Sequence, residues 1–139
     1  MNSELRARLD RVLKEDRVHT LCLRDPQIVA IDEGYVKLQL KITPDALNPY
    51  GMIHGGMLFT MSDSCAGLCA ITLGHKAVTL NSSISFLTSV GSGMIYAESE
   101  LVHAGKTTTV VQVKIRDERD RLLCSSTFTM FSLGSILEK

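Results

Sequence analysis

Residues 55–74 read GGMLFTMSDSCAGLCAITLG, and this stretch decides the fold, because small and apolar side chains occupy every face of the helix that it predicts. A helix that is apolar all round is buried on all sides. A membrane-spanning helix is disfavoured, because Asp63 lies near its centre and small polar residues recur along it, at a cost of several kcal/mol in lipid. We therefore predict a long central helix with the rest of the chain packed around it.

The segments on either side of this helix have other periods. Residues 3–15 place apolar side chains on one stripe of a short amphipathic helix. Within residues 27–43 apolar side chains alternate with polar ones, and a hairpin turn is predicted at Asp32-Glu33-Gly34. Four further strands are predicted at residues 77–89, 93–104, 107–116 and 121–132. Short turns between them indicate an antiparallel meander, and so an α+β fold in which a curved sheet wraps around the central helix.

Length and composition limit the class of protein. The 139 residues predict a single domain over 1–139, with the amphipathic helix within residues 1–18. Lysine plus arginine and aspartate plus glutamate both number 15, so no general field attracts nucleic acid or an anionic membrane. The first 16 residues are charged and lack the apolar run of a secretory signal. The spacing of four cysteines, including Cys22, favours reduced thiols, and we expect a cytoplasmic protein.

Asp63 is the only formally charged side chain between Asp45 and Lys76. A carboxylate inside the most apolar helix loses hydration unless it is paired, protonated or open to a cleft. One interpretation is a structural aspartate that accepts hydrogen bonds from Ser64 or Thr79. The other is a nucleophile or general base that faces a pocket.

The His54-Gly55-Gly56 sequence stands where a loop becomes the central helix. The first N–H groups of a helix lack internal partners, and a glycine there lets a carbonyl oxygen approach them closely. Asn48 and His54 either donate to a substrate or simply cap the helix and pin the loop. Thr79 lies on an alternating strand face with Asn81, Ser83 and Ser85, and its hydroxyl either positions a water or is merely solvated.

Other chemistries lack their motifs. There is no GxSxG elbow, and the four histidines, among them His19, show no HxxxH or HExxH spacing, so we predict no metal site. Cys65 and Cys69 share a helix face, and core packing explains them. Three methionines, at positions 52, 57 and 61, either line an acyl pocket or fill the core.

The segment NPYGMIHGGMLFTMSD, residues 48–63, resembles the signature of hotdog-fold acyl-CoA thioesterases of the phenylacetyl-CoA thioesterase (PaaI) type. With the preceding hairpin and the later SFLTS and HAGKTT segments, the resemblance covers residues 20–132, the expected hotdog core. It implies that Asp63 is the nucleophile or base and that the Gly55 N–H polarises the thioester carbonyl. Asn48 and His54 would then support substrate positioning. One turn after Asp63, where some relatives place a hydroxyl residue that holds a water, this chain has Gly67, which leaves Thr79 or Ser64 as candidates.

The function implied is hydrolysis of an aryl- or medium-chain acyl-CoA without metal or other cofactor. Gly56, Met57, Thr79 and Lys106 are expected to bind substrate, and a local basic patch that includes Lys106 or Arg116 would hold coenzyme A. Two rival functions are a hotdog hydratase or dehydratase acting on acyl thioesters and a non-catalytic acyl-CoA-binding module.

Helix geometry joined to these roles predicts an oligomer. Gly55 and Asp63 are eight residues apart, about 12 Å along a helix axis at 1.5 Å per residue. Both must lie roughly 3 Å from one thioester carbonyl. We therefore predict a symmetric dimer in which antiparallel helices bring Gly55 of one subunit to Asp63 of the other. The resemblance further implies dimers of dimers.

Overall fold

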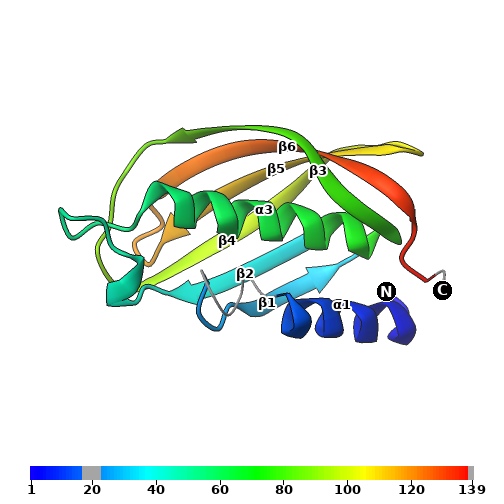
Figure 1. Ribbon diagram of the computed structural model, residues 1–139, viewed down its shortest axis with the longest axis horizontal. Helices are drawn as coiled ribbons and strands as arrows, with labels where there is room; N and C mark the ends of the chain where they lie inside the picture. The colour runs from blue at the N-terminus through cyan, green and yellow to red at the C-terminus, as the bar shows by residue number, and fades with distance from the viewer. Residues whose placement is uncertain (17–22, 138–139) are drawn as a thin grey trace.

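The computed structural model describes residues 1–16 and 23–137. Its elements, in chain order, are α1 (Ser3–Glu15), β1 (Gln27–Asp32), β2 (Tyr35–Lys41), the 3-10 helix η1 (Pro44–Ala46), α3 (Gly55–Thr72), β3 (His75–Phe86), β4 (Met94–Ala104), β5 (Thr108–Asp117) and β6 (Leu122–Ser135). The six strands form one curved antiparallel sheet, and α3 lies along its concave side (Figure 1). The predicted α+β architecture is confirmed. His19, Cys22, the last two residues of the predicted N-terminal helix region and the first three of the predicted core lie outside the described residues.

The prediction of a four-strand meander is wrong for β3. The strand order is β1-β2-β4-β5-β6-β3, so β3 crosses over to pair with β6 at the far edge, and β4 pairs with β2. The link at residues 87–93 is attached at both ends: Leu87 N donates to Leu123 O at 2.8 Å, and Ile42 N donates to Gly93 O at 2.9 Å. The link therefore passes from one side of the sheet to the other, where a tight turn cannot reach.

The predicted hairpin is confirmed. Gly34 follows Asp32 and Glu33 with a φ of +78°, a left-handed conformation that glycine adopts without strain. Gly34 N also donates to Thr72 Oγ1 at 2.9 Å, so the turn docks on the last residue of α3. Along β2, Val36, Leu38 and Leu40 are buried beneath the helix.

Helix α3 is not buried on all sides, contrary to the prediction. Met61, Cys65 and Cys69 are completely buried against the sheet. Phe59 keeps 36% of its surface exposed, however, and the side of the helix that carries Asp63 is only half-buried. Of the parts of the chain that the structure describes, the sheet and α1 cover part of this helix and leave one side open.

Helix α1 adds a second helical layer beside α3 (Figure 1). Asn2 caps it, since its side-chain oxygen accepts from Leu5 N at 2.7 Å. Leu5 and Leu9 are buried in the common core, as the amphipathic stripe predicts.

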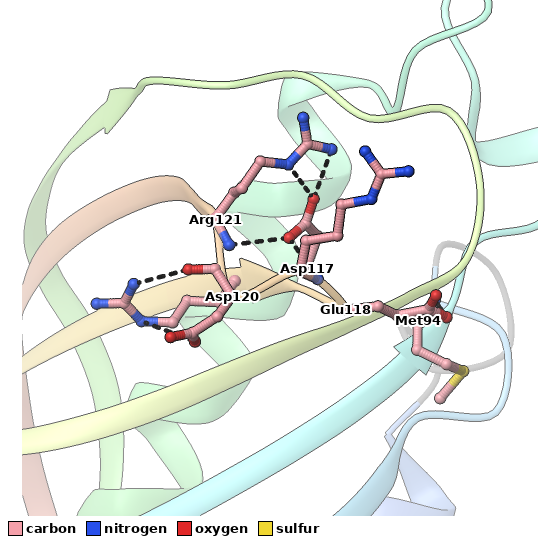
Figure 2. Close-up of polar contacts among 7 residues, drawn as sticks. Met94, Asp117, Glu118, Asp120 and Arg121 are labelled. Atoms are coloured by element: carbon pink, nitrogen blue, oxygen red, sulfur yellow. Dashed lines mark hydrogen bonds and ion pairs between the residues drawn. The ribbon is translucent and has the colours of Figure 1, made fainter.

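The turn between β5 and β6 is held by one buried carboxylate (Figure 2). Asp117 Oδ1 accepts from Arg119 N at 3.0 Å and from Arg121 N at 2.9 Å, and its Oδ2 accepts from Arg121 Nε at 2.7 Å. Burial alone would raise the pKa of Asp117, but the hydrogen bonds from Arg121 and Arg119 outweigh it and hold the pKa below its ordinary value. Glu118 also accepts from Met94 N at 2.7 Å, which fastens this turn to the start of β4.

Candidate active site

Four of the predicted site residues line two separate hollows: Asp63 and Thr79 the first, Asn48 and Gly55 the second. The first, the Asp63 cavity, has a volume of about 360 Å³ and is enclosed by α1, α3, β3 and β6; its walls are Val12, Asp16, Thr60, Asp63, Ser64, Gly67, Leu68, Ile71, Ala77, Val78, Thr79 and Met130. The second, the Gly55 cavity, has a volume of about 250 Å³ at the start of α3; its walls are Asn48, Ile53, Gly55, Leu58, Phe86, Leu87, Thr88 and Ser89.

Asp63 is half-buried at the Asp63 cavity and has a hydroxyl partner there. Thr79 Oγ1 donates to Asp63 Oδ1 at 2.5 Å and also lies 3.6 Å from Met130 Sδ. The contact that the structural interpretation expected from Thr79 is therefore present. The described residues donate no second hydrogen bond to the Asp63 carboxylate, which lines the cavity.

Thr79 owes its position to an irregularity in β3. The register shifts between Thr79, which pairs with Met130, and Asn81, which pairs with Thr129. Because neighbouring residues of a strand point to opposite faces, this shift puts Thr79 on the α3 side and Asn81 on the other. The single polar face predicted for Thr79, Asn81 and the serines after it is wrong, and the bulge is the reason.

At the Gly55 cavity, the helix begins with a free donor. His54 Nδ1 accepts from Gly56 N at 3.2 Å, so His54 caps the helix and the Gly56 N–H is already engaged. The described part of the chain provides no acceptor for the Gly55 N–H. A Cβ added at Gly55 would meet only the Phe86 ring, at 3.5 Å. An incoming carbonyl oxygen can therefore take this N–H.

Asn48 pins the loop before the helix. Its Oδ1 accepts from Tyr50 N at 2.9 Å and from Met52 N at 3.1 Å, and its own N donates to Met52 O at 2.7 Å. Both pinning and capping, one of the two interpretations of Asn48 and His54, are thus present. The Asn48 amide nitrogen makes no recorded hydrogen bond within the described ranges, so it can still serve a ligand in the Gly55 cavity.

One chain does not bring Asp63 and Gly55 together. They line different cavities and are eight residues, about 12 Å, apart on α3. The acid with its hydroxyl partner and the free N–H are two halves of the predicted site.

The other predicted substrate residues are more scattered. Met61 is completely buried and Met57 packs against the core, and neither lines a cavity; Met130 of β6 does. Lys106 is exposed in the turn between β4 and β5. Arg116 Nε lies 3.9 Å from Asp120 Oδ1 in the β5–β6 turn.

Sequence reasoning missed most of the Asp63 cavity. Thr60, Gly67 and Ile71 line it three residues before and four and eight residues after Asp63, spacings that define one helix face. That spacing was a usable signal. The contributions of α1 and Met130 to the cavity could not be predicted, because they come from elements distant in the sequence.

Within residues 1–16 and 23–137, no three histidine, cysteine, aspartate or glutamate side chains are grouped so that they could hold a metal ion. In the same part of the chain, no helix has the length and apolar character needed to cross a membrane.

The curved sheet around one long helix, with these half-sites on the helix, defines a hotdog-fold protein. The chain belongs to the Thioesterase superfamily, whose sequence profile matches residues 50–124. It is a thioester hydrolase by this membership, and the resemblance to the PaaI type is confirmed.

Three relatives illustrate the family. The 1,4-dihydroxy-2-naphthoyl-CoA hydrolase of Listeria monocytogenes is 32% identical over 107 residues, which cover 75% of this chain and 87% of the relative. The acyl-coenzyme A thioesterase PaaI of Escherichia coli is 28% identical over 95 residues, 68% of either chain. Its solved structure, aligned at 21% identity over 94% of both chains with a TM-score of 0.87, shows the same fold.

The third relative is a hypothetical thioesterase protein of Streptococcus pneumoniae, solved with coenzyme A. It has 36% identity and a TM-score of 0.83 over 88% of this chain and 98% of its own. Two variants of a hypothetical thioesterase from that organism have also been solved. One replaces an aspartate with alanine and the other replaces a threonine with alanine. Each is 38% identical to this chain, with a TM-score of 0.78 over 81% of this chain and 93% of its own. Those two positions are 16 residues apart, as are Asp63 and Thr79.

Proposed function

We propose that this enzyme hydrolyses the thioester of an aryl- or medium-chain acyl-CoA, with Asp63 and Thr79 acting on the carbonyl carbon and Gly55 on the carbonyl oxygen. The observation that carries the proposal is the pair formed by a half-buried carboxylate with a hydroxyl partner in a cavity and an unengaged N–H at the start of the same helix. The coenzyme A bound to the streptococcal relative and the acyl-CoA names of the other two support this substrate class.

The Gly55 N–H would stabilise the negative charge that develops on the carbonyl oxygen. Asp63 has two routes open. As a nucleophile it attacks the carbonyl carbon, coenzyme A leaves as the thiolate, and water then hydrolyses the acyl anhydride. As a base it takes a proton from a water that attacks the carbon, and that proton is then available to the departing thiolate. Thr79 donates to Asp63 Oδ1, so the lone pairs of its oxygen stay available to accept a hydrogen bond from the attacking water.

A second copy of the chain would complete the site. β3 is a 12-residue edge strand whose outer side has no partner strand among the residues that the structure describes, and Val78, Leu80 and Phe86 on it are 47%, 58% and 53% exposed. Such an edge pairs readily with another strand. If Gly55 lies opposite Asp63 in an antiparallel two-fold pair, Phe59 is midway and lies opposite its own copy. Phe59 keeps 36% of its surface exposed for such a contact, although its ring also packs against the buried ring of Phe128, with 5.6 Å between the centroids.

The residues that would bind the rest of the substrate are assigned from their positions in the fold. Asn48 and His54 stand beside the free N–H, and Gly56 and Met57 continue the same helix start. Lys106 lies at the end of the sheet where β3 begins, since Ser132 N donates to Thr107 O and Ser132 pairs with Ala77. In the two-fold pair, this exposed ammonium would meet phosphates of the coenzyme A whose thioester carbonyl lies at Gly55 of the same chain. The buried free thiols of Cys65, Cys69 and Cys124 suit the reducing cytoplasm, and pairs of dimers remain the expected assembly.

Replacing Asp63 tests the function. Asp63→Asn keeps the shape of the side chain and removes the charge, so release of free thiol should fall by about two to three powers of ten in a folded protein. The matched control is Asp10→Asn, an exposed carboxylate on α1, which should keep full activity. Nearly full thiol release by folded Asp63→Asn would make Asp63 structural. Hydration of an enoyl-CoA without thiol release would favour the hydratase, and binding without turnover the non-catalytic module.

A further inference from the structure

The wall that α3 contributes to the Asp63 cavity changes character along the helix. Thr60, Asp63 and Ser64 bring polar atoms to one end. One to two turns later Gly67, Leu68 and Ile71 bring none, and Ala77, Val78 and Met130 face them from the sheet. The walls from α3 and the sheet are therefore polar where the reaction would occur and apolar beyond it, while α1 adds Val12 and Asp16.

Gly67 stands at the boundary between the two ends, one turn after Asp63. Glycine in a helix interior costs about 1 kcal/mol relative to alanine. Gly67 has no left-handed backbone to justify that cost. Nor does packing require it, because an added Cβ would meet only the end of the Met130 side chain, at 3.9 Å, an ordinary contact. What Gly67 provides is empty space in the cavity.

We infer that Gly67 determines which acyl groups this enzyme accepts, because its missing side chain leaves room for bulk close to the thioester carbonyl. This inference rests on the proposed function. With the carbonyl at Asp63, the acyl group extends over Gly67 toward Ile71, about 6 Å and 12 Å further along the helix axis. A ring or branch near the carbonyl fits over Gly67 and would collide with any larger residue. Gly67 therefore sets the limit on how bulky an acyl group can be next to the carbonyl.

The test compares wild type with Gly67→Ala and Gly67→Leu on phenylacetyl-CoA and acetyl-CoA. One methyl group in an apolar pocket changes kcat/KM by about tenfold or more. We expect Gly67→Ala to lower kcat/KM for phenylacetyl-CoA about tenfold and Gly67→Leu about a hundredfold or more, with acetyl-CoA changed less than threefold in both. Ala7→Leu, on the exposed side of α1, adds a similar side chain outside the cavity and should change neither substrate.

A binding measurement separates this inference from the proposed function. A thioether of coenzyme A in which a methylene group separates the sulfur from the phenylacetyl carbonyl cannot be hydrolysed, so its affinity is measurable even in an inactive protein. Gly67→Leu should bind the thioether at least tenfold more weakly than wild type, with the affinity for coenzyme A unchanged. Wild type that binds the thioether but never releases thiol would refute the hydrolase and leave the pocket intact. An equal loss of kcat/KM for phenylacetyl-CoA and acetyl-CoA would overturn the role of Gly67. So would an unchanged affinity of folded Gly67→Leu for the thioether.

Discussion

Two inactive variants with lesions in different cavities should restore activity to each other when they share a dimer. The first is Asp63→Asn, which removes the acid. The second is Gly55→Pro, which removes the free N–H. The 12 Å between these residues on one helix is the reason to expect this, because no single chain can bring both to one carbonyl.

The structure indicates that Gly55→Pro will fold. Proline is well tolerated at the first residue of a helix, and Gly55 is that residue of α3. His54 before it has φ −66° and ψ 134°, the extended conformation that a residue before proline prefers. The Gly55 N–H that proline deletes has no acceptor in the described part of the chain.

The expected magnitude follows from counting sites. In a mixed dimer one site combines the intact Gly55 of one subunit with the intact Asp63 of the other, and the second site carries both lesions. Random reassortment makes about half of the dimers mixed, each with one working site of two, so about a quarter of wild-type activity should return. Purification through two different tags leaves only mixed dimers and should give about half.

The control mixes two variants whose substitutions both lie in the half of the site that contains Asp63. Asp63→Asn with Thr79→Val leaves every site of a mixed dimer with one defect, so this pair should stay at the level of its parents. The assay is thiol release after co-refolding, with the mixed dimer verified by mass. If doubly tagged Asp63→Asn and Gly55→Pro dimers are folded yet inactive, the shared site is wrong.

Three further predictions follow from other parts of the molecule. In Phe59→Cys, mild oxidation should form a disulfide between the two subunits, whereas in Met52→Cys, at an exposed position, it should not. Mass spectrometry of the disulfide-linked peptide identifies the bond. Raising salt should increase KM for acyl-CoA more than for an uncharged short thioester if Lys106 holds phosphates, and equal sensitivity would exclude that role. Asp117 has a lowered pKa when folded, so its contribution to stability is present above its unfolded pKa and disappears as pH falls through its folded pKa. Thermal melts of wild type and Asp117→Asn should therefore converge in acid, and a constant gap would contradict the assignment.

The sequence was most informative where the determining contacts are local. The hairpin at Gly34 follows from a turn residue with positive φ, and α3 from an apolar run between clear boundaries. The pairing of β3 with β6 was not predictable from turn lengths, because hydrogen bonds at both ends of residues 87–93 determine the crossover.

The candidate site shows the same division. Asp63 was predictable, since it is the lone charge in an apolar segment. Thr79 was identified, but on the wrong strand face, because one bulge reverses the alternation and no residue type announces it. The uniform apolar pattern of α3 also predicted burial without revealing what covers the helix. The pattern is the same whether the cover is the chain's own sheet or a second copy.

The crossover of β3 also bears on how the chain reaches its native state. The β4–β5 and β5–β6 hairpins pair residues close in sequence, whereas β3 residues pair with β6 residues 38 to 60 positions away. Bringing distant segments together carries a larger loop-closure entropy, so long-range strand pairing is slow relative to hairpin formation. Docking of β3 is therefore expected to follow the assembly of the β4–β5–β6 unit. Because Thr79 reaches Asp63 only from the docked strand, the acid and its hydroxyl partner meet late in folding.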